Sequence, residues 1–483
     1  TVKASSVVRG MSLAQILLVV AAGAFVEAAP PPQSFAGTTL RIAVDSDTEL
    51  PMWEKEAGAI GAEYGIELKL EVVPFTDLYN RLRKEVPTGV SEYDIVSFPP
   101  IYNGDLMDGG FLAPLDELIA RYPAEVDDIL PPFRDPYMQW NGTTFGVTFD
   151  GDIFVLYFRR DLFDHPAERA RFKQEYGYEL APPQTWVEYF QIAKFFTRKS
   201  GDKLGDATLK EPFYGTVEWW QPPINFFGWA ARFGSLGGLY FDNNMNPQIN
   251  SPAGTKALQA FLGTLQYMSP DAVNYDFPAI RRDLLEGHAA MAIYWPTDIK
   301  LANVPGKYPA AGKLGVVSLP GTKLPDGALR VAAPIAYGKV LAIPKASRSQ
   351  EAAFQVIRYM TSPDVSLRWI SDPSTGLDPY RYSHIERLDE WTLQWDGMEQ
   401  YADGLVRNLE NAYPELTLPG AADYMQVAAV QFQRAARGEI SPQEAVNSAA
   451  KMWNDLTDRQ GRERQIGIWR MTLDSWSRAG LLR

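Results

Sequence analysis

GTTFGVTFDGDIFVLYFRRDLF, residues Gly142–Phe163, is the stretch that decides the fold. It contains two β-rich runs, 145–149 and 153–158, separated by the polar break Asp150-Gly151-Asp152. Such a strand pair, near one third of a long chain, fits either the interior of one domain or a crossing between two domains. The order of elements around it favours the crossing.

Strand-like and helical patterns alternate before this stretch. Runs typical of strands at 39–44, 66–73 and 93–98 are separated by helical patterns at 51–64 and 76–86. Alternation of this kind predicts a mostly parallel sheet covered by helices, so the expected fold class is α/β.

The crossing stretch resembles the first inter-lobe crossover of the family 1 extracellular solute-binding proteins, the sugar-binding components of ABC importers. Thr148 and Arg160 stand where that family usually has proline and lysine. Thr185 and Glu188 have the capping-box spacing of a helix start and belong to a second matching motif. The motifs that carry the resemblance are Phe145–Thr148, Tyr157–Phe163, Pro182–Glu188, Asp283–Pro296, Tyr337–Lys345, Asp378–Ser383 and Ser441–Ala445.

The resemblance implies a two-lobed periplasmic binding protein fold, type II-like, with the lobes joined by three crossover strands and the ligand in the cleft between them. It places the first lobe at 38–149 and 296–340, with Gly315–Gly321 as its last strand. It places the second lobe at 150–295 and 341–483, with the C-terminal helices on this lobe.

Composition excludes several classes of protein. The chain has 483 residues, of which 46% are hydrophobic and 12% aromatic, which is enough for well-packed cores. Its formal net charge of -13 argues against nucleic acid and anionic membrane surfaces as partners. The absence of cysteine excludes disulfides, thiolate metal sites and a lipid-attachment cysteine.

Residues 1–29 have the pattern of a signal peptide. Lys3 and Arg9 precede the apolar run Leu13–Val26, and small residues follow it. The alternative is a short membrane anchor, but the run falls below the roughly 18 to 20 residues needed to span a bilayer. We therefore expect a soluble periplasmic protein without a lipid anchor.

A sugar or polyol needs flat aromatic surfaces together with carboxylates, amides or arginines at fixed positions. Trp220 and Trp229 lie in the most aromatic part of the chain, and Trp295 follows an apolar strand. Trp229 is the preferred stacking residue because it precedes the Gly237-Gly238 pair, much as in the maltose-binding relative. Packing in the core, or at a hinge for Trp295, is the alternative for each ring.

Polar candidates come from strand ends and from the crossing itself. Asp45, Asp47 and Tyr102 follow strands, where open α/β sheets bind ligands. Asp150 and Asp152 lie in the crossing and could accept hydrogen bonds from ligand hydroxyls. Helix capping is the alternative for Asp45 and Asp47.

Two further polar candidates come later in the chain. Asp298 follows Trp295, with a surface or helix-capping role as its alternative. Arg381 lies in the segment that resembles a Pro-x-Arg-x-Ser motif, and it could bind ligand hydroxyls or pair with a carboxylate such as Asp150. The structural ion pair is the favoured role for this arginine.

The sequence therefore predicts a periplasmic receptor that captures a sugar or polyol and delivers it to ABC transporter permease subunits. We expect a monomer with no cofactor, no metal, no nucleic acid partner and no catalysis. A receptor for a charged solute, such as a polyamine or an organic anion, is one alternative. A secreted carbohydrate-active enzyme is the other, because Asp150 and Asp152 form a carboxylate pair.

Overall fold

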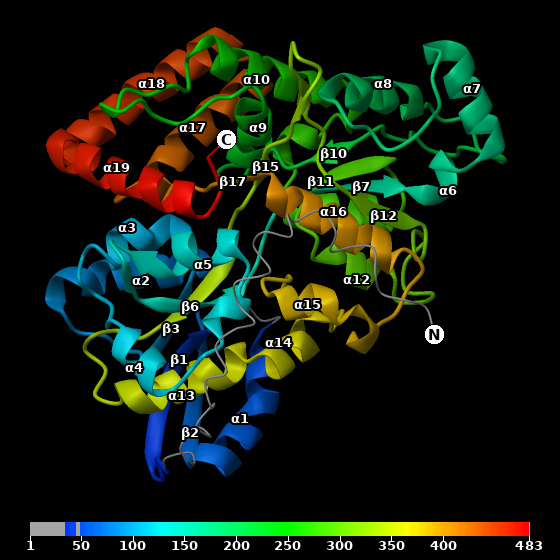
Figure 1. Cartoon of the computed structure of the whole chain (residues 1–483). Coiled ribbons are helices and arrows are strands. Elements are labelled where there is room, and N and C mark those ends of the chain that lie inside the picture. The colour runs from blue at the N-terminus through cyan, green and yellow to red at the C-terminus, as the bar shows by residue number, and fades with distance from the viewer. Residues whose placement is uncertain (1–33, 45–48, 483) are drawn as a thin grey trace.

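The computed structural model describes residues 34–44 and 49–482. It has two lobes, each built on its own β-sheet with helices around it (Figure 1). The first lobe, in the lower half of Figure 1, contains the sheet β2-β1-β3-β16-β6, and the second lobe contains the sheet β10-β11-β7-β12. The α/β class and the two-lobed fold are confirmed.

The sheet of the first lobe is mixed. β1 runs parallel to β2 and β3, whereas β16 is antiparallel to β3 and β6. α1 packs against β2 through a buried face that includes Trp53 and Ile60, seven residues apart and therefore two helical turns apart. The strands of this sheet are β1 (Thr38–Val44), β2 (Ile66–Val72), β3 (Ile95–Phe98), β6 (Gly146–Asp150) and β16 (Lys339–Ala342). The helices of this lobe are α1 (Leu50–Tyr64), α2 (Phe75–Glu85), α3 (Asn103–Leu106), α4 (Asp116–Arg121), α5 (Pro131–Met138), α13 (Gln350–Thr361), α14 (Pro363–Ile370) and α15 (Tyr382–Glu386).

The sheet of the second lobe centres on β7, which is antiparallel to both of its neighbours, β11 and β12. All of β7 is buried, as its apolar sequence requires. The strands are β7 (Val155–Arg159), β10 (Val217–Glu218), β11 (Met291–Tyr294) and β12 (Leu314–Val317). The helices are α6 (Arg160–Phe163), α7 (Pro166–Tyr176), α8 (Trp186–Phe196), α9 (Asn225–Ser235), α10 (Pro252–Gly263), α11 (Phe277–Leu285), α12 (Asp298–Ala302) and α16 (Met398–Glu410).

The predicted capping box at the start of α8 is confirmed. The backbone N–H of Glu188 donates to Thr185 Oγ1 at 3.2 Å, and the backbone N–H of Thr185 donates to Glu188 Oε2 at 3.1 Å. Short two-residue ladders lie outside the main sheets: β4 (Gln139–Trp140) with β5 (Thr143–Thr144), β8 (Lys203–Leu204) with β9 (Ala207–Thr208), β13 (Thr322–Lys323) with β14 (Leu329–Arg330), and β15 (Ala333–Pro334) with β17 (Ala412–Tyr413).

The C-terminal helices are α17 (Ala421–Ala436), α18 (Pro442–Arg459) and α19 (Arg462–Arg478). α17 packs against α9, and α18 packs against α10, in the upper half of Figure 1. α19 also contacts α5 of the first lobe, and Arg464 pairs there with Asp108. The C-terminal helices therefore contact both lobes.

The chain passes between the lobes three times. The first two passages, 150–154 and 334–338, are extended and pair through an antiparallel bridge between Ile153 and Ile335. The third is the irregular segment between α15 and α16. A Cβ atom on Gly151 would lie 2.4 Å from the carbonyl oxygen of Pro379, so this close approach admits only glycine.

The predicted lobe boundaries are wrong in two places. β12 was assigned to the first lobe, yet it pairs with β7 in the second-lobe sheet. The segment after residue 340 was assigned to the second lobe, yet β16 and α13 pack against β6 in the first. The reason is that β11 is not a passage between lobes, because it pairs with β7 along its whole length. Assignment of the remaining segments stays a prediction, and residues 1–29 lie outside the described residues.

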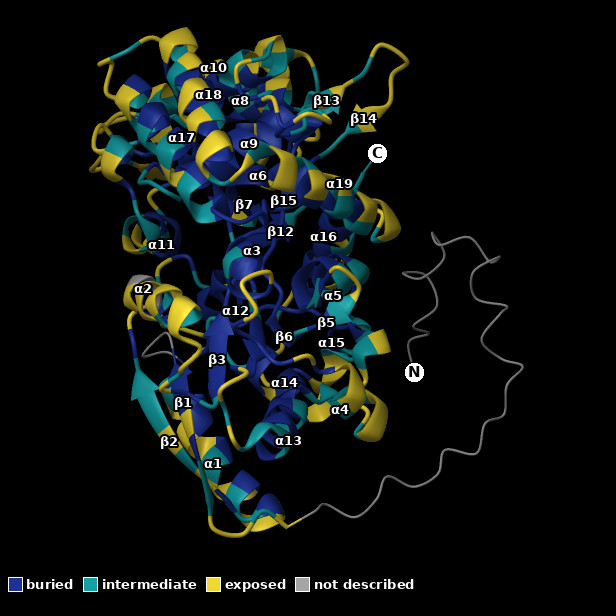
Figure 2. Ribbon diagram, turned by 90° about the vertical axis from the view of Figure 1, so that its left-hand side faces the viewer, coloured by how far each residue is buried: buried dark blue, intermediate teal, exposed yellow. Residues whose placement is uncertain are grey.

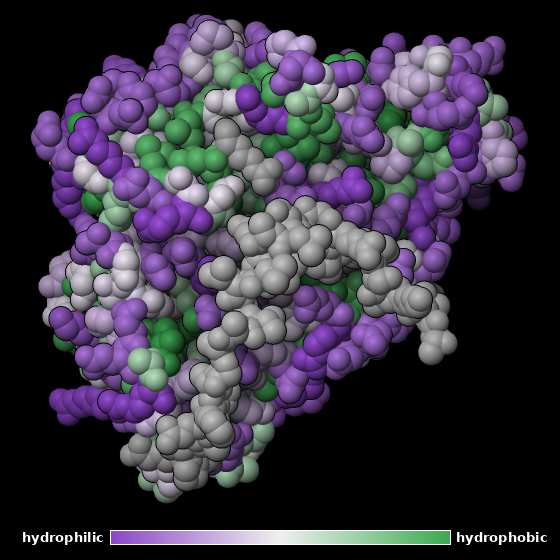
Figure 3. Space-filling model, in the orientation of Figure 1, coloured by the Kyte–Doolittle hydropathy of each residue, from purple (hydrophilic) through white to green (hydrophobic). Residues whose placement is uncertain are grey.

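Buried residues run through both sheets and through the region between them (Figure 2). On the face seen in Figure 3, hydrophilic residues dominate the margins, and hydrophobic residues gather in patches in the upper half. Across residues 34–44 and 49–482, none of the helices combines the length and apolarity that a membrane span requires.

Candidate ligand-binding site between the lobes

Three carboxyl groups meet where the first passage leaves β6. The backbone N–H of Asp378 donates to Asp150 Oδ1 at 2.7 Å, and Thr297 Oγ1 donates to Asp378 Oδ2 at 2.8 Å. Asp152 is also buried, and the carbonyl oxygen of its peptide accepts from the backbone N–H of Ala336. Within the described residues, Oδ1 of Asp152 and Oδ1 of Asp378 have no hydrogen-bond partner. The side chains of Asp152 and Asp378 also interact with each other, and this contact raises the pKa of Asp152.

Burial favours the protonated form of these carboxyl groups by raising their pKa values. It raises the pKa of Asp150 well above the usual range, although the nearby Lys339 opposes the rise. Burial, followed by the charge of Asp150, raises the pKa of Asp152 in the same direction. Burial also raises the pKa of Asp378 to about 6, against the opposing charge of Lys300. A protonated carboxyl can donate as well as accept, which suits the hydroxyls of a polyol.

The second lobe supplies an aromatic wall. Trp295 is partly exposed, and its Nε1–H donates to the carbonyl oxygen of Ala336 at 2.8 Å, which fixes the ring beside the second passage. Trp219 meets it edge to face, with the ring centroids 5.5 Å apart. Phe277 lies 6.2 Å from Trp295 and completes the wall. In the part of the chain that the structure describes, Nε1 of Trp219 is buried without a partner.

The first lobe contributes Tyr102, which follows the end of β3 as the strand-end argument predicted. Its ring stacks on Tyr79 at 3.6 Å, and the hydroxyl of Tyr79 donates to Asp105 at 2.8 Å. Tyr102 is 6% exposed, so most of its surface is already covered by neighbouring residues.

Tyr337, on the second passage, lies beside the aromatic wall of the second lobe. It has a φ of 67°, in the left-handed region that favours glycine, and a non-glycine residue there costs about 1–3 kcal/mol. Its ring lies 6.4 Å from Trp295 and 6.0 Å from Phe227. The strained backbone therefore places an aromatic ring at the junction of the lobes.

Glu415 is a buried acid, near Tyr102 and Tyr337, that the sequence analysis did not single out. It is 3% exposed, and burial raises its pKa well above the usual range. Its charge is close enough to add to the effect of burial on the pKa of both Tyr102 and Tyr137, which lie in the first lobe. The available signal was a single acidic residue in the otherwise uncharged run 411–420.

The predicted roles of Trp220 and Trp229 in the site are wrong. Both rings are fully buried in the second lobe. Trp220 stacks on Phe261 at 3.9 Å, and Trp229 stacks on Phe233 at 4.4 Å. The Nε1–H of Trp229 donates to the carbonyl oxygen of Gly254 at 3.0 Å, so the ring is satisfied within the core. The core alternative holds for both tryptophans.

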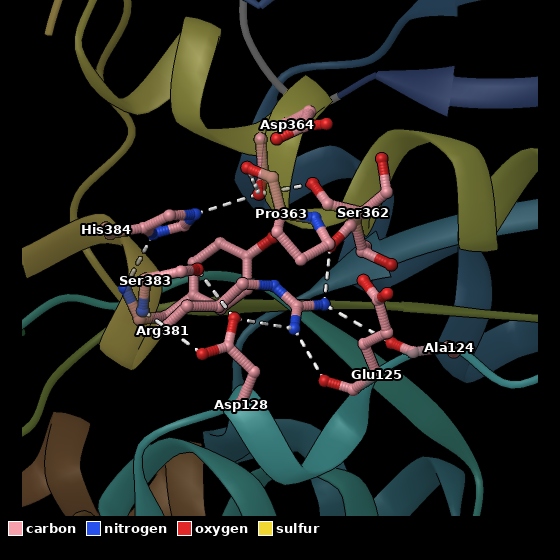
Figure 4. Close-up of polar contacts among 12 residues, drawn as sticks. Ala124, Glu125, Asp128, Ser362, Pro363, Asp364, Arg381, Ser383 and His384 are labelled. Carbon is pink, nitrogen blue, oxygen red and sulfur yellow. Dashed lines mark hydrogen bonds and ion pairs between the residues drawn. The ribbon is translucent and has the colours of Figure 1, made fainter. Parts of the chain in front are cut away.

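Arg381 is a structural residue in the first lobe, so its assignment to the site is wrong (Figure 4). Its guanidinium donates to the carbonyl oxygens of Glu125 at 2.7 Å and Thr361 at 2.5 Å. It pairs with Asp128 at 3.5 Å, and not with Asp150 as the sequence had allowed. The favoured structural ion pair is therefore confirmed, with a different partner.

Both carboxylate oxygens of Asp298 also bind neighbouring side chains. It is fully buried at the start of α12, where its Oδ1 accepts from Arg281 and its Oδ2 accepts from the hydroxyl of Tyr294 at 2.7 Å. Its assignment to the ligand site is wrong, because an ion pair inside the second lobe uses both oxygens. Asp45 and Asp47 lie outside the described residues.

A polar groove of about 640 Å³ opens at the edge of the lobe junction. The β4–β5 hairpin forms one side through Trp140 and Asn141, and α19 forms the other through Arg470 and Arg478. Thr417, two residues beyond Glu415, lines the same groove. In residues 34–44 and 49–482, no group of three or more His, Cys, Asp or Glu side chains is arranged to hold a metal ion.

Two sheet-centred lobes, joined at a hinge and facing each other with carboxyl and aromatic groups, define the class of two-lobed ligand receptors. Residues 48–366 match the bacterial extracellular solute-binding proteins, and the chain belongs to this family. The family predicted from the crossing stretch is therefore confirmed.

Individual relatives are similar at low sequence identity. A probable amino-acid ABC transporter periplasmic-binding protein of Sinorhizobium fredii is 21% identical, with 71% of this chain and 73% of the relative aligned. A ribitol-bound solute-binding protein of Agrobacterium radiobacter superposes with a TM-score of 0.72 at 22% identity, covering 88% of this chain and all of the other. Maltose-bound MalE3 of Thermotoga maritima gives 0.70 at 22% identity, covering 87% and 100%. At these identities the likeness of the structures shows the fold alone.

Proposed function

We propose that the protein is a periplasmic receptor that captures a sugar or polyol between its lobes and delivers it to ABC transporter permease subunits. The observation that carries the proposal is the junction itself, where the partly exposed Trp295 is held beside the second passage by its bond to Ala336 and lies 6.4 Å from Tyr337. The buried carboxyl groups of Asp150 and Asp152 lie on the first passage, which pairs with the second. Aromatic faces suit sugar C–H surfaces, and carboxyls suit hydroxyls. The ribitol, mannitol and maltose bound by similar structures support this ligand class.

Capture works by a shift of population. A ligand that contacts both lobes stabilises the closed arrangement over the open one, and closure then presents a surface that the permease recognises. In this proposal the protein works as a monomer and does not catalyse a reaction. Export from the cytoplasm through residues 1–29 belongs to the same proposal.

The test is thermal melting of the purified protein against matched panels of pentitols, hexitols, monosaccharides, disaccharides, polyamines and organic acids. A solute at 100 times its dissociation constant stabilises the folded state by about 2.7 kcal/mol. We expect stabilisation by at least one sugar or polyol and no turnover of it. Stabilisation by organic acids alone would overturn the ligand class, and product formed from an oligosaccharide would establish an enzyme.

A further inference from the structure

Glu415 is a buried acidic residue at the lobe junction with no cationic side chain paired to it in the described residues. It is 3% exposed, and across the described ranges no side chain donates a hydrogen bond to either carboxylate oxygen. The backbone N–H of Tyr337 opposes the effect of burial on the pKa of Glu415 but does not overcome it. Burying a carboxylate without a cation costs free energy of folding. A ligand that supplies a cation would offset that cost and so explain the burial of Glu415.

Tyrosines lie next to Glu415 in the chain and in space: Tyr413 pairs with Pro334 of the second passage, and the hydroxyl of Tyr240 donates to the carbonyl oxygen of Pro414 at 3.0 Å. Burial and the charge of Glu415 raise the pKa of Tyr102, Tyr137, Tyr240 and Tyr337, and in Tyr240 and Tyr337 a neighbouring tyrosine adds to the rise. The first two of these tyrosines come from the first lobe and Tyr240 comes from the second. The face of an aromatic ring is negative, so rings around a carboxylate favour a cation more than a neutral group.

A second acid faces the same space. After burial and the charge of Glu415, the charge of Asp152 is the next cause that raises the pKa of Tyr137, so both acids act on this tyrosine. Asp152 keeps Oδ1 without a partner in the part of the chain described. Two buried acids, one on the first passage and one in the segment after β17, therefore act on the same tyrosine.

The lysines nearest the junction are already engaged. Lys339 Nζ forms an ion pair with Glu49. Lys300 Nζ donates to the carbonyl oxygens of Ile370 at 2.8 Å and Leu377 at 2.7 Å. Neither lysine pairs with Glu415, so a compensating positive charge is best supplied by the ligand.

We propose that the solute carries a protonated amine, bound by Glu415 among the rings of Tyr102, Tyr137 and Tyr337. The proposal rests on the solute-capture function proposed above and narrows its ligand to a polyhydroxylated amine, such as an amino sugar or an amino polyol. Hydroxyls of the same solute meet Asp152 and the face of Trp295. The carboxylate and the ammonium satisfy each other in the closed protein, which neither could do with a neutral partner.

The test is isothermal titration calorimetry with solutes matched in pairs at pH 7. Each pair differs only by an amine, as in sorbitol with 1-amino-1-deoxysorbitol and glucose with glucosamine. We expect the amine of at least one pair to bind at least about tenfold tighter than its neutral partner, and Glu415→Gln to remove this advantage. Glu410→Gln changes an exposed glutamate on α16 and should leave both affinities unchanged.

The outcomes separate the two proposals. Neutral members that bind as tightly as the amines would overturn the ammonium proposal while the sugar or polyol function stands. An amine advantage that survives in Glu415→Gln would also overturn it, because the amine would then bind elsewhere. Failure of every solute to bind the wild type would refute the proposed function itself. If Glu415→Gln does not fold, Glu415→Met gives an uncharged side chain of similar volume for the same comparison.

Discussion

Replacement of Arg381 by methionine tests whether this arginine supports the fold and not the ligand. The variant keeps most of the apolar stem and removes the guanidinium. In the wild type that group is fully buried and binds the carbonyl oxygens of Ala124, Glu125 and Thr361 together with the carboxylate of Asp128 (Figure 4). The change therefore removes one donor from three carbonyl oxygens and from one carboxylate. Glu125 keeps the backbone N–H of Asp128, and Asp128 keeps the backbone N–H and hydroxyl of Ser383.

The expected loss follows from those contacts. An unsatisfied buried acceptor costs about 1–3 kcal/mol, and breaking a buried ion pair costs about 3–5 kcal/mol. These terms overlap because one group serves all the acceptors, so we expect Arg381→Met to lose about 3–5 kcal/mol of unfolding free energy. Arg387, on the neighbouring turn, pairs with Asp364 and Glu390 near the surface, and Arg387→Gln should lose only about 0–1 kcal/mol.

Urea denaturation followed by tryptophan fluorescence measures both variants against the wild type. Ligand affinity is then measured without urea, at a temperature at which each variant is folded. A loss below about 1 kcal/mol for Arg381→Met would contradict the structural role. A normal stability with ligand affinity reduced more than tenfold would return Arg381 to the binding site.

Four further predictions follow from the junction and the cores. Trp295→Ala should weaken ligand binding by about 1–3 kcal/mol, measured by calorimetry, because a partly exposed ring at the junction is lost. Trp229→Ala should lose about 3–5 kcal/mol of unfolding free energy, measured by denaturation, while the folded fraction keeps its affinity. Gly151→Ala should weaken closure, measured by the change in radius of gyration on adding ligand, because its Cβ would lie 2.4 Å from the carbonyl oxygen of Pro379. The raised pKa of Asp378, about 6, gives stability that is present below pH 4 and lost as the pH rises through 6, on the order of 2–3 kcal/mol, so Asp378→Asn should flatten this decline in pH-dependent melts.

The fold could be predicted because its decisive features are local. The break Asp150-Gly151-Asp152 interrupts an apolar strand pair, and in the structure it leads from one sheet to the other. The lobe boundaries could not be predicted in the same way. Whether β11 stays with β7 or leaves for the other sheet depends on pairing between residues more than 130 positions apart, such as Met291 with Phe158, and no local pattern specifies that choice.

The sequence could propose candidates where a strand or a passage ends. Tyr102, Asp152 and Trp295 come from that argument, and their contact with a ligand stays a prediction. Trp229 was misplaced because a buried ring and a ligand-stacking ring have the same composition around them, and only packing against Phe233 distinguishes them. Glu415 was missed because it lies in an irregular segment without a motif, although one acid in an uncharged run was a usable signal.

The buried acids at the junction raise the free energy of the closed arrangement when no ligand is bound. The same acids therefore make closure depend on the ligand. Bringing Glu415 and Asp152 out of water leaves carboxyl oxygens unpaired, so the closed arrangement is disfavoured until a solute supplies donors. Moving such an equilibrium from 1:99 to 99:1 requires about 5.5 kcal/mol of preferential binding to the closed state. Two charge-assisted hydrogen bonds, at about 1.5–3 kcal/mol each, with ring contacts at Trp295 of about 1–3 kcal/mol, reach that value. On the same figures, a neutral solute that satisfies only one of the two acids supplies about 2.5–6 kcal/mol, most of which lies below the required value. The affinity of an amine and the extent of closure should therefore rise together.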